Sequence, residues 1–220
     1  MQGEERTIGF VDLAGFTALN DQHGDEEATE VAMIFFSHAR EAVTNRGEVV
    51  KTIGDAVMLA FPTPAPALAA LRELLLRCQE TINQPALRSG LHHGPVLEQD
   101  GDWFGATVNI AARVTATAPS GETYVTKLVA DAARDQGEVV VDLGAHRLRH
   151  LAEPVALWAV RLVEPPEATS IDPVCHMRVV HATAAAHVRD RGADLWFCST
   201  SCLRAYLDHP TMFDPSPSGR

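Results

Sequence analysis

The chain has 220 residues, of which 46% are hydrophobic and 21% charged, so it can bury a sizeable core and is too apolar for a disordered polypeptide. Its formal net charge of -11 argues against nucleic acid or an anionic membrane surface as a partner. No stretch reaches the roughly 18 uncharged apolar residues of a membrane span, and residues 1–5 do not resemble a signal peptide, so we expect a cytoplasmic protein.

The N-terminal part begins with a predicted strand, residues 8–11, which ends at Asp12 and is followed by a loop that contains a glycine. From Asp25, which suits the N-cap of a helix, apolar residues recur with helical spacing as far as Val43. This pattern predicts a long amphipathic helix after the first strand.

Two runs rich in β-forming residues follow, residues 48–52 and 56–61. The residues between them predict a hairpin turn that displays Asp55. The proline-containing segment 62–66 leads into a second amphipathic helix, whose apolar face includes Cys78. We therefore interpret Cys78 as a buried core thiol.

Alternating strands and helices complete the N-terminal part and predict a layered α/β sandwich. The strands are expected at residues 87–92, 95–99, 122–126, 139–143 and 155–163. One helix is expected at 107–118 and a short one between the strands at 122–126 and 139–143. The pair His92 and His93 stands at a predicted strand end and is interpreted as structural.

Charge and cysteine content divide the chain into two parts. Residues 1–165 contain 23 acidic and 13 basic residues, whereas residues 166–220 contain 6 and 5 but hold three of the four cysteines. The segment 164–171 is rich in proline and small residues, which is typical of a linker. The domains are therefore expected at 1–163 and 172–214, joined by this linker and followed by a tail at 215–220.

Asp12, at a strand end, and Asp55, on a hairpin turn, are candidate metal ligands. Adjacent strands of one sheet would bring both carboxylates to the same edge, and Mg²⁺ usually binds one or two carboxylates together with substrate phosphates. The alternative is that each aspartate caps its own turn, as most loop aspartates do.

Three further polar residues lie on predicted regular elements. Asn109 and Arg113 are four positions apart and share one face of the helix at 107–118, where they can bind phosphate charge; the alternative is a solvated helix face. Lys51 is one of only two lysines against sixteen arginines, and on a strand it can donate a hydrogen bond to the edge of a base.

Together, residues 6–163 resemble the catalytic domain of class III nucleotidyl cyclases. Residues 10–17 (FVDLAGFT) and 50–61 (VKTIGDAVMLAF) are similar to its two metal motifs. Residues 101–113 (GDWFGATVNIAAR) resemble its substrate and transition-state segment, and residues 142–160 its closing strand pair. This resemblance implies an α+β fold, a ferredoxin-like βαββαβ sandwich, and a short-armed bacterial adenylate cyclase.

The resemblance also implies the substrate and the metal ions. Asp12 and Asp55 would hold two Mg²⁺ or Mn²⁺ ions on the triphosphate, and Lys51 and Asp102 would read the base. A lysine donor with an aspartate acceptor suits adenine, because N1 of adenine accepts and its N6 amino group donates, whereas guanine presents the reverse pattern. ATP is therefore expected as the substrate, with a guanylate cyclase as the alternative.

Three residues are expected on the other side of the substrate. Asn109 would orient the ribose, and Arg113 would stabilise charge on the α-phosphate. Arg149 stands where the family usually has a triphosphate-binding lysine, and His150 replaces a nearby glycine. In the family the metal pair and the other residues come from different subunits, which implies a head-to-tail homodimer. A non-catalytic protein that senses metal or binds nucleotide is the second alternative.

The C-terminal part holds Cys175, Cys198 and Cys202, three soft ligands that suit a thiophilic metal such as Zn²⁺ or Cu⁺. Residues 172–214 resemble the YHS domain of the TRASH-like metal-binding group, through DPVCHM at 172–177 and FCSTSC at 197–202. The alternative is a small structural knuckle or a metal-free fold. Candidates for a fourth ligand are His176, His181, His187 and His209. We hypothesise that metal occupancy of this module regulates the cyclase domain.

Overall fold

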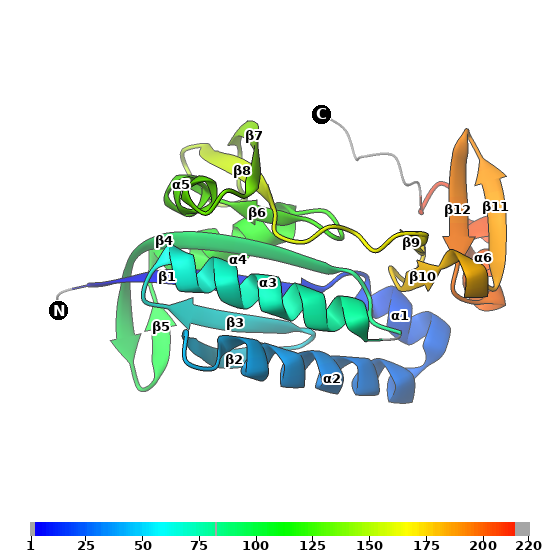
Figure 1. Cartoon of the computed structure of the whole chain (residues 1–220), viewed down its shortest axis with the longest axis horizontal. Helices are drawn as coiled ribbons and strands as arrows, with labels where there is room; N and C mark the ends of the chain where they lie inside the picture. Colours follow the sequence, from blue (N-terminus) through cyan, green and yellow to red (C-terminus); the bar gives the residue numbers. More distant parts are fainter. Residues whose placement is uncertain (1–2, 82, 214–220) are drawn as a thin grey trace.

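The computed structural model of the chain describes residues 3–81 and 83–213, so the tail expected at 215–220 lies outside the described residues. Strands and helices are interspersed along the first 161 residues, and four short strands, a 3₁₀ helix and an α-helix follow (Figure 1). In chain order the larger part contains β1 (Glu4–Leu13), α1 (Phe16–His23), α2 (Asp25–Val43), β2 (Glu48–Ile53), β3 (Ala56–Phe61), α3 (Pro64–Glu80), β4 (Leu87–Gln99), β5 (Asp102–Phe104), α4 (Ala106–Thr117), β6 (Thr123–Val125), α5 (Lys127–Asp135), β7 (Val139–His146) and β8 (Val155–Arg161).

One sheet organises the larger part, with the strand order β2-β3-β1-β4-β6-β8-β7. The first four strands pair antiparallel, which is the arrangement expected of a ferredoxin-like βαββαβ unit. The chain then adds β6 parallel to β4 and the hairpin of β7 and β8. The sheet thus places β1, which carries Asp12, between β3 and β4.

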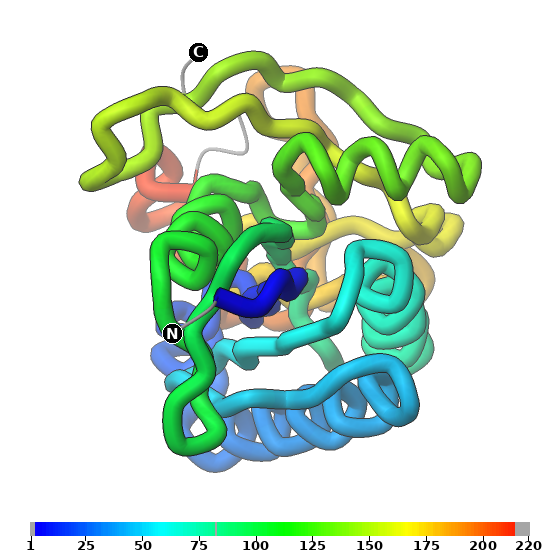
Figure 2. The backbone as a smooth tube through the Cα atoms, turned by 90° about the vertical axis from the view of Figure 1, so that its left-hand side faces the viewer, coloured from blue at the N-terminus to red at the C-terminus, as the bar shows by residue number. Residues whose placement is uncertain are grey.

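Helices cover both faces of this sheet (Figure 2). Helices α2, α3 and α5 pack on one face through a large apolar core that includes Phe35, Leu71 and Val129. Helix α4 packs on the other face through Ala111, against Ile8 and other side chains of the strands. Cys78 lies in the first core with 2% exposure, which confirms it as a buried core thiol, and burial raises the pKa of this thiol to about 12.

Two details of the expected elements are wrong. The residues expected to form two strands, 87–92 and 95–99, form the single strand β4, because β1 pairs with residues 87–96 and bridges the break expected at Gly94. Helix α2 begins at Asp25 after Gly24, so Asp25 is the first helical residue and not the N-cap. The carboxylates of Asp25 and of two glutamates in the first turn stabilise the helix, because negative charge interacts favourably with the positive end of the helix dipole.

The C-terminal residues form a small module at one end of the sheet, beside α1 (Figure 1). Its elements are β9 (Thr169–Ile171), β10 (Arg178–Val180), the 3₁₀ helix η1 (His181–Thr183), β11 (Ala186–Asp190), β12 (Ala193–Phe197) and α6 (Thr200–Asp208), so part of the expected linker forms β9. Val174, Met177 and Phe197 of the module belong to the same apolar core as α2 and α3. Among the helices of the described residues, none combines the length and the apolar character that crossing a bilayer requires.

His92 on β4 leads to a prediction on stability. Burial lowers the pKa of its imidazole to about 4, and its Nδ1 lies 2.7 Å from the Thr126 hydroxyl. The unfolded chain therefore binds a proton below about pH 6.5 that the folded chain does not bind until about pH 4, so stability falls as the pH decreases through this window. Between pH 7 and pH 4.5, we expect the free energy of unfolding of His92→Gln to fall by about 2 kcal/mol less than that of the parent.

The measurement is urea unfolding of both proteins at the two pH values. The comparison uses the change with pH, because the substitution also alters the hydrogen bond to Thr126. Equal losses of stability in the two proteins would contradict a neutral, structural role for His92.

Candidate active site

Asp12 and Asp55 meet at one end of the sheet. Asp12 lies at the end of β1, directly opposite Ala56, and Asp55 lies in the turn before β3. The backbone amide of Leu13 donates to the carbonyl oxygen of Asp55 at 3.4 Å, which holds the two segments together. Burial, together with the neighbouring Asp12 carboxylate, raises the pKa of Asp55 to about 6. The two acidic side chains therefore form one site, although 43 positions separate them.

Arg88 is a member of this site that sequence reasoning missed. It lies on β4 opposite Asp12, and its Nε donates to Oδ2 of Asp12 at 2.7 Å. No local pattern marks it, because the contact depends on the register of two strands 76 positions apart. Arg88 neutralises part of the charge on Asp12 but contacts only one carboxylate oxygen.

The site fits divalent cations. Within the described residues, Oδ1 of Asp12 is buried and accepts no hydrogen bond. A buried carboxylate oxygen without a partner is unfavourable, and so is a second carboxylate beside it. Mg²⁺ and Mn²⁺ take oxygen ligands of this kind, so Asp12 and Asp55 are suited to hold them.

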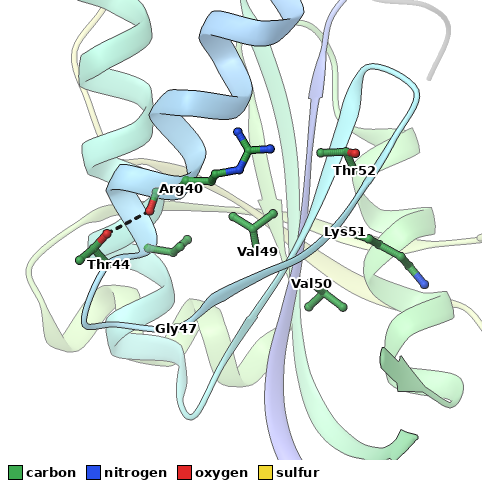
Figure 3. Close-up of a pocket in the computed structure, with 8 residues that line it drawn as sticks. Arg40, Thr44, Gly47, Val49, Val50, Lys51 and Thr52 are labelled. Atoms are coloured by element: carbon green, nitrogen blue, oxygen red, sulfur yellow. Dashed lines mark hydrogen bonds between the residues drawn. The ribbon is translucent and has the colours of Figure 1, made fainter. Parts of the chain in front are cut away.

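Lys51 reaches the α4 side of the sheet because β2 contains a β-bulge. The pairing with β3 shifts between Val49 and Lys51, so that Lys51 lies opposite Met58. Met58 belongs to the core beneath α4, whereas Val49 packs into the core on the other face. Figure 3 shows the result: Lys51 points away from Val49 and Arg40. A bulge re-aims side chains in this way.

The Lys51 ammonium forms an ion pair with the Asp102 carboxylate of β5. The hydrogen bond from Lys51 holds the pKa of Asp102 below its usual range, so the carboxylate stays ionised. The neighbouring Trp103 is buried, and its indole Nε1 donates to Glu48 at 2.8 Å, which ties β5 to β2. An ammonium has three donors and a carboxylate several acceptor sites, so the pair retains hydrogen bonds for a ligand.

A surface groove with a volume of about 510 Å³ lies between the end of α2 and β2 (Figure 3). Its lining includes Arg40, Thr44 and Gly47. Lys51 is the member of the candidate site that borders it, and its side chain leaves on the opposite side. The groove is therefore separate from the candidate site.

Asn109 and Arg113 lie on helix α4, which packs on the face of the sheet opposite to α2 and α3. Its close approach to β4 requires Gly90, because a Cβ there would lie 2.3 Å from the backbone nitrogen of Thr115. Asn109 is exposed, and the guanidinium of Arg113 donates to the backbone carbonyl of Arg149. The exposed Arg149 thus lies next to Arg113.

His150, which stands at a position where glycine was expected, adopts a left-handed conformation with φ of 62°. This conformation favours glycine and costs other residues energy. The turn after Arg149 therefore keeps the backbone shape of a glycine turn despite the histidine.

The expected residues thus form three groups: Asp12 with Asp55, Lys51 with Asp102, and Arg113 with Asn109 and Arg149. Among the described residues, no hydrogen bond or ion pair joins Lys51 or Arg113 to either metal-site aspartate. Within a single copy of the chain, the three groups of candidate residues are therefore not connected to one another.

Comparison with known proteins identifies the family of the chain. Residues 2–156 match the family described as the adenylate and guanylate cyclase catalytic domain, which is more than half of the chain. The chain belongs to this cyclase family. The matched segment of the cyclase domain contains all three groups of residues and ends ahead of the clustered cysteines.

Two bacterial relatives of the cyclase domain are adenylate cyclases by name. A pH-sensitive adenylate cyclase of Mycobacterium tuberculosis (strain CDC 1551 / Oshkosh) is 38% identical over 159 residues, which are 70% of this chain and 40% of that protein. An adenylate cyclase of Streptomyces coelicolor is 36% identical over 119 residues, which are 54% of this chain and 31% of that protein. The chain therefore spans less than half the length of these curated relatives.

Solved cyclase structures share the fold. The adenylyl cyclase CyaB from P. aeruginosa superimposes with a TM-score of 0.62 at 21% identity, over 76% of this chain and 97% of that one. The adenylate/guanylate cyclase/hydrolase from Silicibacter pomeroyi gives a TM-score of 0.60 at 28% identity, over 71% and 96% of the two chains. These matches confirm the mixed α+β cyclase fold.

The three cysteines of the module lie together, with His23 of the cyclase domain beside them. The four histidines named as candidates for a fourth ligand lie outside this cluster. The rings of His181 and His187 stack on Trp196, with centroids 3.9 and 4.1 Å away. His176 packs against Gly15, and His209 follows the end of α6. No sequence spacing could indicate His23, which precedes Cys175 by more than 150 residues.

Proposed function

We propose that the chain is an adenylate cyclase, which converts ATP to 3′,5′-cyclic AMP and pyrophosphate. The observation that carries the choice of ATP is the Lys51–Asp102 ion pair at the sheet face beside α4. Its ammonium can donate to N1 of adenine, and its ionised carboxylate can accept from the N6 amino group. Guanine would place a donor against the ammonium and an acceptor against the carboxylate. The names of the two bacterial relatives support the same substrate.

The reaction forms one bond and breaks one. The 3′-oxygen of the ribose attacks the α-phosphorus and loses its proton to water, and the bond from the α-phosphorus to the bridging oxygen breaks, which releases pyrophosphate. Asp12 and Asp55 would hold two Mg²⁺ or Mn²⁺ ions. When bound, these ions lower the pKa of the 3′-hydroxyl and neutralise charge on the triphosphate.

The other residues position the substrate and stabilise the charge that develops on it. Asn109, exposed on α4, orients the ribose. Arg113 stabilises the negative charge on the α-phosphate, and the neighbouring Arg149 binds the triphosphate. Since the three groups of residues do not meet within one copy, we infer that two copies complete each site in a head-to-tail homodimer. The enzyme is expected in the cytoplasm, where thiols stay reduced.

We also infer that residues 172–214 form a YHS-like module, separate in origin from the cyclase domain at 1–163. Its three cysteines are suited to a thiophilic metal, Zn²⁺ or Cu⁺. The module packs beside α1, close to the loop that follows Asp12, which is a position from which metal occupancy can influence the active site.

The function is tested by incubating the purified protein with Mn²⁺ and either ATP or GTP and quantifying both cyclic nucleotides. Cyclic AMP is expected with little cyclic GMP. Lys51→Ala should lower kcat/KM for ATP about 10- to 100-fold, because it removes a charged hydrogen bond to the base and leaves Asp102 unpaired. Preferential formation of cyclic GMP would contradict the choice of ATP, and the absence of any cyclic product would make the domain a nucleotide-binding module.

A further inference from the structure

Four side chains converge where α1 meets the C-terminal module: His23, Cys175, Cys198 and Cys202. Their ligand atoms all lie within 4.8 Å of one another. The Cys198 sulfur is 3.4 Å from the Cys175 sulfur, 3.7 Å from the Cys202 sulfur and 3.5 Å from Nε2 of His23. A disulfide requires about 2.05 Å between sulfurs, so these are three separate thiols.

The distances match the edges of a tetrahedral metal site. For Zn–S bonds of about 2.3 Å, tetrahedral geometry places two sulfurs about 3.8 Å apart and a sulfur and a nitrogen about 3.5 Å apart. The observed edges at Cys198 lie within about half an ångström of these values, and the Cys202 sulfur is 4.0 Å from Nε2 of His23. Three thiolates and one imidazole form an established donor set for structural Zn²⁺.

The neighbours of the four side chains hold them in place. Nδ1 of His23 lies 3.1 Å from the Glu27 carboxylate, which directs Nε2 toward the sulfurs. The fully buried Asp172 accepts hydrogen bonds of 2.8 Å from the backbone amides of Val174 and Cys198. The Ser199 hydroxyl accepts from the backbone amide of Cys202 at 3.1 Å. Metal-ligating histidines and thiolates are commonly oriented by partners of this kind.

We propose that His23 completes a Cys₃His site for Zn²⁺, so that the bound ion ties the cyclase domain to the C-terminal module. The proposal rests on the inference that the three cysteines bind a metal, and it adds a ligand from the other domain. All four coordination positions are filled by protein, which makes the site structural and leaves no open position for catalysis.

The site lies against the active-site loop. The backbone amide of Ala86 donates to the carbonyl of His176, and the amide of Ala14 donates to the carbonyl of Ala86, both at 2.9 Å. Gly15 has room for no side chain, because a Cβ would lie 2.3 Å from the His176 ring. The turn that carries Cys175 and His176 therefore packs on the residues that follow Asp12. A metal ion bound by His23 and the three cysteines would hold the turn in this position.

The test uses the full-length reduced protein and Co²⁺ as a spectroscopic probe that Zn²⁺ then displaces. We expect one thiolate-bound Co²⁺ per chain, seen as thiolate-to-cobalt charge-transfer absorption and the intense visible bands of tetrahedral Co²⁺. His23→Ala should bind Zn²⁺ about 100-fold more weakly and change the visible bands. His23→Cys should restore tight binding and increase the charge-transfer absorption, because a fourth thiolate replaces the imidazole. His187→Ala is the matched control, since this histidine belongs to the module but not to the cluster.

The outcomes distinguish metal binding by the three cysteines from the participation of His23, and none of them depends on cyclase activity. If His23→Ala keeps the parent's affinity and spectrum, His23 is not a ligand, and the three cysteines bind without it. If the parent binds no Co²⁺ or Zn²⁺ under reducing conditions, both the cysteine site and the role of His23 are wrong. Loss of binding in His23→Ala with recovery in His23→Cys supports the site, because binding then follows the presence of a ligand atom at position 23.

Discussion

Replacing Asp12 by asparagine is expected to lower Mn²⁺-dependent cyclic AMP formation about 1,000-fold without unfolding the protein. The asparagine amide has nearly the same shape as the carboxylate but lacks the negative charge that holds a cation. Only one carboxylate of the pair, that of Asp55, then remains to bind the metal ions. The fold should persist, because the amide oxygen can still accept from Arg88, and because the substitution removes the like charge that raises the pKa of Asp55. The measurement is initial rate against Mn²⁺ concentration at fixed ATP, with thermal unfolding as the check on folding.

Asp21→Asn provides the matched control. Asp21 is exposed on α1, the helix that follows the Asp12 loop, and lies outside the three groups of site residues. This variant should retain the parent's rate. Activity within about tenfold of the parent in folded Asp12→Asn would show that the carboxylate pair is not the metal site.

Arg113→Ala is the second substitution with a large expected effect, a loss of about 100- to 1,000-fold in kcat. Its guanidinium is held by the backbone carbonyl of Arg149 and is available to stabilise charge on the α-phosphate. Because that charge increases in the transition state, the loss is expected mainly in kcat, with a smaller change in KM. Steady-state kinetics with ATP separate the two parameters, and an unchanged kcat would contradict this role.

Mixing two inactive variants extends this test to the assembly. In a head-to-tail dimer of one Asp12→Asn chain and one Arg113→Ala chain, one site combines the intact aspartates of one copy with the intact arginine of the other. Random reassortment should therefore restore about a quarter of the parent's activity. A mixture of Asp12→Asn with Asp55→Asn is the control and should stay inactive, because both defects affect the same half of every site. No recovery in the first mixture, despite exchange of subunits, would exclude sites shared between copies.

The sequence predicted the elements that carry the site better than the contacts within it. The strand that carries Asp12, the turn at Asp55 and the helix with Asn109 and Arg113 all follow from local hydrophobic patterns. The break expected at Gly94 was wrong, because pairing with β1 along ten positions outweighs the weak strand preference of one glycine.

What the sequence could not predict depends on pairing between distant segments. The bulge that turns Lys51 onto the α4 side is visible only once β2 and β3 are aligned. Arg88 reaches Asp12 because of strand register, and His23 reaches the cysteines because the module packs on the end of α1. Hydrophobic periodicity describes each element alone and carries no information on such contacts.

The apolar core that the cyclase domain shares with the module has a consequence for folding. Met177, Phe197 and Tyr206 are buried in the same cluster as the helices that cover the sheet. Regions that bury surface against each other tend to open and close together, so we expect the cooperative folding unit to extend past residue 156, where the family match ends. A substitution that destabilises the packing of the module is therefore expected also to lower the local stability of the loop around Asp12. The end of the family match at residue 156 therefore does not coincide with the end of the shared apolar core.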